Sequence, residues 1–268
     1  MSNTRPAAVA GTFYPGERER LAAMVDRLLA EAPVPTGRAP QALVVPHAGY
    51  IYSGPIAATA YARLQGAASH LRRVVLLGPA HRVAFRGLAL PEAEGMETPL
   101  GVVAVDTEAV AAVAGLPQVG PFASAHAQEH SLEVQLPFLQ KVLPGVPVLP
   151  LVVGAASAEQ VAEVLEHLWT DEGTLVLISS DLSHYRSYEE ARVVDRETAR
   201  RILALDAEHL DPEQACGAIP MSGLLLAARR RGLRAEQLDV RNSGDTAGDR
   251  SRVVGYGAFA FSAPEVSA

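Results

Sequence analysis

RRVVLLGPAH, residues 72–81, is an apolar run that ends abruptly in a histidine. The same arrangement occurs in QALVVPHAGY, residues 41–50, which ends its run at His47, and in GTLVLISSDLSHY, residues 173–185, which reaches His184. Short, nearly all-apolar runs are typical of strands in a sheet that is covered on both faces. These three segments therefore predict a buried sheet with a histidine just beyond each of three strands.

The rest of the chain alternates between strand-like and helix-like patterns. Strands are expected at 41–46, 73–77, 87–90, 102–105, 146–153, 175–179, 238–241 and 252–261, and helices at 55–64, 129–142, 158–169, 188–204, 212–215 and 221–231. No repeat and no low-complexity linker interrupts this order. The pattern predicts an α/β fold, a single domain over residues 1–268 with a mostly buried mixed sheet flanked by helices.

Composition excludes several classes of function. The formal net charge is −7, and no basic block is longer than the RRR of 229–231, so neither nucleic acid nor a membrane surface is expected as a partner. The N-terminus lacks the apolar core of a signal peptide, and no stretch approaches 18 apolar residues. The single cysteine, Cys216, fits a reducing compartment, so a cytoplasmic location is expected.

The histidines at the strand ends form the candidate site. Ligands of α/β sheets bind beyond the carboxyl ends of the strands, so His47, His81 and His184 are expected to converge on one metal-binding cleft. The loop RNSGDTAGDRS, residues 241–251, offers Asp245 as a carboxylate ligand. Two histidines and one carboxylate, with open positions opposite, are the ligands of non-haem Fe(II) oxygenases. A tight Asx/Gly turn is the alternative explanation of the loop.

A second group of polar residues lies in AQEHSLEVQLPFL, residues 127–139. His130 begins the predicted helix, and the string from His126 through Glu129 to His130 matches the H-x-x-E-H pattern of zinc metallopeptidases. That motif needs an established helix, whereas Pro121 and the small residues after it predict a loop at His126. A zinc-dependent hydrolase is therefore only a third alternative. Cys216 precedes an apolar helix and is interpreted as a small buried thiol.

Seven segments, spread from about Val9 to Phe261, together resemble one known family. They are AVAGTFYPG, VVPHAGYIYSG, LLGPAH, EHSLEVQLPFL, SSDLSHY, CGAIPMSG and SGDTAGDRSRVVGYGAF. In this order they resemble the signature segments of the Memo family, whose bacterial and archaeal members are called AmmeMemoRadiSam system protein B. The resemblance covers nearly the whole chain.

This resemblance implies a fold similar to that of the class III extradiol dioxygenases, the LigB-like group. It implies that His47 and His81 are metal ligands and that His184 is the histidine at the mouth of the site. In animal Memo proteins a cysteine completes the metal site, in the loop that corresponds to residues 242–247. This chain offers Asp245 there and no cysteine, which favours Fe(II) as the cofactor, with copper and zinc as alternatives.

The leading functional hypothesis is a metal-dependent redox or dioxygenase-like enzyme that acts on a small molecule or peptide. His184 would transfer the substrate proton and His130 would assist it. Four further residues are candidates for contact with the substrate: Tyr50, Tyr52, Arg82 and Arg250. The alternative is a non-catalytic adaptor that binds a peptide or small ligand through Arg82, Arg241 and Arg250. The family's name also suggests a radical SAM protein and an Ammecr-type protein as partners.

Overall fold

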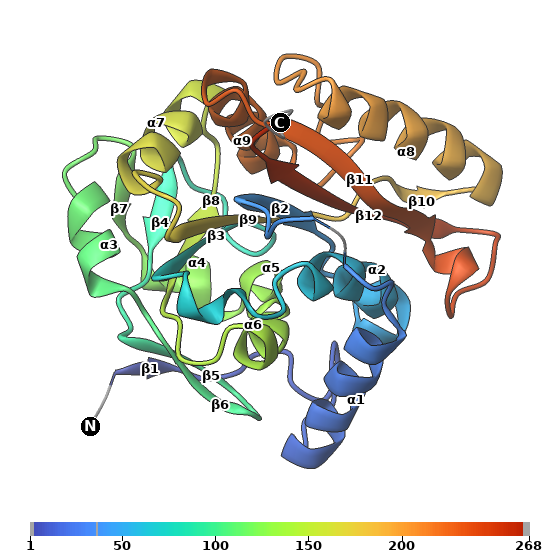
Figure 1. Cartoon of the computed structure of the whole chain (residues 1–268), viewed down its shortest axis with the longest axis horizontal. Helices are drawn as coiled ribbons and strands as arrows, with labels where there is room; N and C mark the ends of the chain where they lie inside the picture. The colour runs from blue at the N-terminus through green and yellow to red at the C-terminus, as the bar shows by residue number, and fades with distance from the viewer. Residues whose placement is uncertain (1–2, 36, 265–268) are drawn as a thin grey trace.

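The computed structural model describes residues 3–35 and 37–264, and a large mixed sheet runs through its centre (Figure 1). Within the described residues this sheet has nine strands, in the order β10 (His184–Arg186), β12 (Val253–Ser262), β2 (Ala42–Val45), β9 (Thr174–Ser179), β3 (Arg73–Pro79), β8 (Val148–Val153), β4 (Leu88–Leu90) and β7 (Val119–Pro121), with β11 (Arg234–Asn242) also paired to β12. A small sheet contains β1 (Thr4–Arg5), β5 (Gly95–Thr98) and β6 (Gly101–Ala104).

Helices cover both faces of the large sheet, and each face has its own apolar core. One core includes side chains of α1 (Arg18–Glu31), α2 (Tyr50–Ala62), α4 (Ala123–Ala127), α5 (His130–Glu133) and α6 (Leu136–Val142). The other includes side chains of α3 (Thr107–Val113), α7 (Ala158–Leu168), α8 (Tyr188–Leu203) and α9 (Ala218–Arg230). The predicted α/β class, with a buried mixed sheet flanked by helices, is confirmed.

The three strands that precede His47, His81 and His184 in the sequence lie side by side. β9 pairs in parallel with β2 on one side and with β3 on the other, and all the residues of β2 and β9 are buried. Parallel neighbours end at the same edge of a sheet. The segments that follow β2, β9 and β3 therefore meet at one place, which becomes the candidate site.

Three expected helices differ from those observed. The helix predicted over 129–142 is two helices, because Pro137 lies in the first turn of α6 and cannot supply the N–H that would continue α5. The helix predicted to begin at 55 already begins at Tyr50, so residues 50–54 are helical rather than a turn. Residues 212–215 form turns and not a helix.

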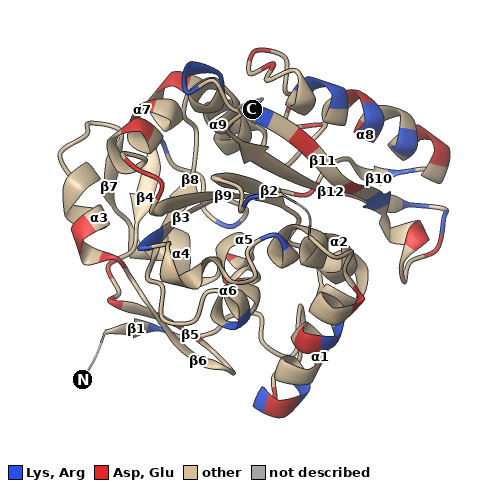
Figure 2. Ribbon diagram, in the orientation of Figure 1, with Lys and Arg blue, Asp and Glu red and all other residues tan. Residues whose placement is uncertain are grey.

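Charged residues are frequent along helices such as α1, α7 and α8, while the central strands carry few of them (Figure 2). The basic run at 229–231 ends α9, and Arg230 bridges to Glu159 and Glu166 of α7. The run therefore lies at the polar end of a helix. Among the described residues, no helix has both the length and the apolar character needed to span a bilayer.

One buried carboxylate on α8 gives the fold a dependence on pH. Asp195 accepts a hydrogen bond from the Ser183 N–H and lies against Gly255 of β12, where a Cβ atom would lie 2.1 Å from the carboxylate. Burial raises the pKa of Asp195 from its usual 3.8 to about 6, although the Ser183 hydrogen bond and Arg186 oppose the shift. The folded chain therefore keeps a proton here that the unfolded chain has already released.

We expect Asp195 to stabilise the fold most at low pH. Its contribution is present below about pH 4 and is lost as the pH rises through about 6, a change of roughly 2–3 kcal/mol. Asp195→Asn removes the titration, so the variant should gain stability relative to the wild type across this interval. Urea unfolding at several pH values measures the difference, and a constant difference would contradict the assignment.

Candidate metal centre

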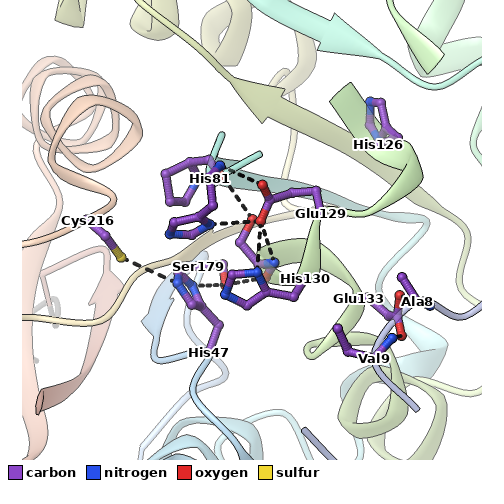
Figure 3. Close-up of polar contacts among 12 residues, drawn as sticks. Ala8, Val9, His47, His81, His126, Glu129, His130, Glu133, Ser179 and Cys216 are labelled. Atoms are coloured by element: carbon purple, nitrogen blue, oxygen red, sulfur yellow. Dashed lines mark hydrogen bonds and ion pairs between the residues drawn. The ribbon is translucent and has the colours of Figure 1, made fainter. Parts of the chain in front are cut away.

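Two histidines and the only cysteine gather at the shared strand edge (Figure 3). His47 follows β2, His81 follows β3, and Cys216 lies just before α9. One ligand atom from each lies within 4.8 Å of the other two. Imidazole nitrogen and thiolate sulfur are ligands of iron, copper and zinc, so these three side chains form a candidate metal site.

The hydrogen bonds of His47 leave its Nε2 free to bind a metal. Its Nδ1 lies 2.9 Å from the Oγ of Ser179, the last residue of β9. The Ser179 hydroxyl donates its only hydrogen to the Ser131 carbonyl at 2.6 Å, and it also accepts from Gln135. Ser179 therefore accepts from His47, which places the His47 proton on Nδ1. Nε2 then carries a lone pair and faces the Cys216 sulfur at 3.4 Å.

Glu129 holds His81 in the same way. Its carboxylate accepts the His81 Nδ1–H at 2.8 Å, the His81 backbone N–H at 2.6 Å and the Ser131 N–H at 3.0 Å. Burial favours the neutral acid, but these hydrogen bonds outweigh it and lower the pKa of Glu129 to about 2. An ionised carboxylate behind a metal-binding histidine fixes its tautomer and makes the imidazole more basic. His81 therefore also directs an unprotonated Nε2 away from Glu129.

Cys216 reaches His47 because the chain beside it packs closely on the end of β9. The Gly217 N–H donates to the Ser180 Oγ at 2.9 Å, and a Cβ atom at Gly217 would lie 2.6 Å from the Ser180 Cβ. Burial, together with Asp181, raises the pKa of the Cys216 thiol to about 12, so the thiol is neutral without a metal. Burial and the neighbouring His81 lower the pKa of His47. Metal binding would therefore release the thiol proton.

His130 lies beside this cluster, as the sequence predicted. Its ring centroid is 4.5 Å from that of His81 and 5.4 Å from that of His47. Burial and the neighbouring His81 lower the pKa of His130 to about 4, so its imidazole is neutral near pH 7. With His81 and Glu129 it forms a second group that could hold a cation. In this structure Glu129 instead serves as a hydrogen-bond acceptor for His81.

His184 and Asp181 lie next to the metal cluster without belonging to it. Asp181 follows β9, and its Oδ1 accepts the His47 backbone N–H at 2.7 Å. Burial raises the pKa of Asp181 to about 6, although the His47 N–H and His184 oppose the shift. His184 begins β10, and it influences the pKa of both His47 and Asp181. The expected convergence is thus seen for His47 and His81, whereas His184 supplies no atom to the group of three ligand atoms.

The prediction that Asp245 completes this site is corrected. Its two carboxylate oxygens accept hydrogen bonds from the Tyr188 hydroxyl and the Asn242 N–H, so the loop is the tight capped turn that stood as the alternative. Asp245 lines a separate cavity of about 210 Å³ between α8 and β11. Arg250, which was predicted to contact the substrate, belongs to the same loop as Asp245. Its Cζ lies 4.3 Å from the ring centroid of Tyr188 on α8. Cys216 stands where the carboxylate was expected.

Two other predictions about single residues also change. Tyr50 is buried in the core, and its hydroxyl donates to the Val134 carbonyl at 2.7 Å, so it is not free to meet a substrate. His126 is helical rather than in a loop, and its Nε2 bonds to the Ala89 carbonyl, apart from the metal cluster (Figure 3). The zinc-hydrolase motif therefore does not assemble. Tyr52 is partly exposed on α2, and Arg82 is exposed beside His81.

Comparison of the sequence with known proteins identifies the family. A family model described as Memo-like protein matches residues 5–260. The chain belongs to the Memo family. A MEMO1 family protein of Aquifex aeolicus is 38% identical over 263 residues, which cover 94% of this chain and 97% of that one. One of Archaeoglobus fulgidus is 38% identical over 96% of this chain and 99% of its own.

A solved structure also overlaps with this Memo protein. It is that of the uncharacterized protein JW3007 from Escherichia coli K12, with a TM-score of 0.47 and 16% identity. The overlap covers 80% of this chain and 98% of that chain.

Sequence reasoning missed two residues of the centre of this Memo protein. The sequence predicts a structural thiol at Cys216 because no basic residue is near it in the chain, whereas His47 approaches it in space. The sequence predicts that Glu129 lies at the start of a helix. It does: Glu129 is the N-cap of α5, and its side chain accepts a hydrogen bond from the Ser131 N–H. The signal available in the sequence was that CGAIPMSG and EHSLEVQLPFL both belong to the segments that carry the family resemblance.

We expect Glu129→Gln to weaken metal binding about 10- to 100-fold, as for other partners behind a ligand histidine. The amide keeps the size of the side chain but loses the negative charge that polarises His81. Isothermal titration with Zn²⁺ measures the change. Glu163→Gln, on the exposed side of α7, is the matched control. Equal affinities of the wild type and Glu129→Gln would show that Glu129 has no part in the site.

Proposed function

We propose that this Memo protein is a metal-dependent redox enzyme whose metal is held by His47, His81 and Cys216. The observation that supports it is the convergence of the three ligand atoms, with both imidazoles fixed by Ser179 and Glu129 so that Nε2 is free. Three protein ligands leave further coordination positions for a substrate and a second reactant. The side chain of His81 is 27% exposed, which gives access from solvent.

Iron is the first candidate metal, because of the resemblance to non-haem iron dioxygenases. The three candidate ligands are two imidazoles and a thiol rather than a hard carboxylate, since Asp245 accepts a hydrogen bond from Tyr188 elsewhere. The thiolate also suits copper and zinc, which remain the alternatives. When bound, a redox-active ion would supply Lewis acidity and electron transfer at the free positions.

The protein side chains would bind the substrate and move its proton. His184 lies at the edge of the cluster, where an imidazole can take a proton from a substrate hydroxyl and return it later. Asp181 lies beside it and holds the backbone of His47 in place. His130 is neutral and packs against Phe13, with the two ring centroids 4.7 Å apart. Tyr52 and Arg82 stay as candidate substrate contacts.

Anaerobic purification followed by elemental analysis tests the proposal first. The wild type should carry close to one equivalent of iron or copper per chain. Oxygen uptake with a panel of catechols then tests ring-cleavage chemistry, and His184→Ala should lower turnover while it leaves the metal content unchanged. A chain that binds none of the three metals would fit the peptide-binding alternative instead. Copurification with radical SAM and Ammecr-type proteins tests those partners.

A further inference from the structure

Tyr185 has a strained backbone at the edge of the metal cluster. Its φ angle is +58°, in the left-handed region that glycine or asparagine adopts easily and a bulky aromatic residue rarely does. It is also the extra residue of an irregularity in the β10–β12 pairing, where His184 pairs with Val254 and Arg186 pairs with Val253. Bulges of this kind redirect side chains and are frequent next to active sites.

The strained residue carries a large exposed ring. Tyr185 is 66% exposed, and its ring centroid is 5.8 Å from that of His184, the proposed proton-transfer residue. The Tyr185 ring therefore lies next to His184, in the segment that follows β9.

Packing within the chain does not account for this tyrosine. The Arg252 guanidinium lies 5.0 Å from the ring centroid, but an exposed cation–π contact is at the weak end of its range. The ring buries little, and glycine would relieve the backbone. Strain at a position of this kind points to a role in binding.

We propose that Tyr185 is a specificity-determining residue that stacks on a flat aromatic group of the substrate. The inference rests on the proposed function, because the substrate's oxygen donors would reach the metal held by His47, His81 and Cys216. The aromatic part then extends past His184 to the exposed ring. Arg252 on the Tyr185 ring supports the same stack.

Hydroxamates test this without turnover, because they bind metals through two oxygens and carry a chosen substituent. The full-length chain is loaded with Zn²⁺, and the affinities of acetohydroxamate, benzohydroxamate and 4-phenylbenzohydroxamate are measured by calorimetry. Tyr185→Asn is the test variant, since asparagine tolerates the left-handed backbone and keeps the bulge. Tyr185→Phe, which retains the ring, is its control.

The proposal predicts that Tyr185→Asn loses affinity for at least one aryl hydroxamate by about three- to tenfold. Its affinity for acetohydroxamate should not change, and Tyr185→Phe should bind all three compounds like the wild type. Equal affinities of the wild type and Tyr185→Asn for both aryl compounds would overturn the proposal while leaving the metal site intact. Failure to bind zinc would overturn the proposed function and this inference with it.

Discussion

His47→Ala is expected to abolish stoichiometric metal binding. His47 is 1% exposed, supplies one of three ligand atoms and is oriented by Ser179. Removal of an outer partner of a ligand costs about 10- to 100-fold in affinity, so removal of the ligand itself should cost more than 100-fold. Elemental analysis after dialysis against a weak chelator measures the loss.

A histidine far from the site gives the matched control. His167 is exposed on α7, and its Nδ1 bonds to the Glu163 carbonyl in the same helix. His167→Ala should retain the metal content of the wild type. If His47→Ala also retains it, the ion is bound elsewhere and the proposed centre is wrong.

Glu133→Ala is expected to destabilise the fold by about 3–5 kcal/mol, the range for breaking a buried ion pair. Glu133 is completely buried on α5, and it forms an ion pair with Arg5. It also accepts hydrogen bonds from the N–H groups of Ala8 and Val9 and from the Tyr14 hydroxyl. Truncation would leave the buried Arg5 guanidinium without its counter-charge, and the two N–H groups and the Tyr14 hydroxyl without this acceptor.

An exposed ion pair separates this effect from a general loss of charge. Glu189 on α8 bonds to Arg192 and is 77% exposed, so Glu189→Ala should cost no more than about 1 kcal/mol. Urea unfolding of both variants gives the comparison. Equal losses would mean that the Arg5–Glu133 pair does not hold the N-terminal segment against α5.

The position of the site was predictable because it depends on periodicity, which is local in sequence. Apolar runs gave the strands β2, β3 and β9, and parallel pairing brought the residues that follow them to one edge. His47 and His81 were found in this way. The resemblance to the Memo family placed the same two residues independently.

The third ligand was not predictable from local pattern. Cys216 depends on a tertiary contact, the close packing of Gly217 on Ser180, which no spacing in the sequence reveals. The prediction for Asp245 was wrong for the opposite reason. Its carboxylate accepts a local hydrogen bond, from the N–H of Asn242 three residues earlier in the chain. The left-handed backbone of Tyr185 was equally hidden, because tyrosine does not signal a bulge.

Cobalt binding distinguishes Cys216 from Asp245 as the third ligand of the centre. Co²⁺ bound to the full-length chain should show a thiolate-to-cobalt charge-transfer absorption. We predict that Cys216→Ser loses this absorption and binds the ion more weakly, whereas Asp245→Asn is unchanged in both. Loss of metal binding in Asp245→Asn, with Cys216→Ser unaffected, would contradict the centre described for His47, His81 and Cys216.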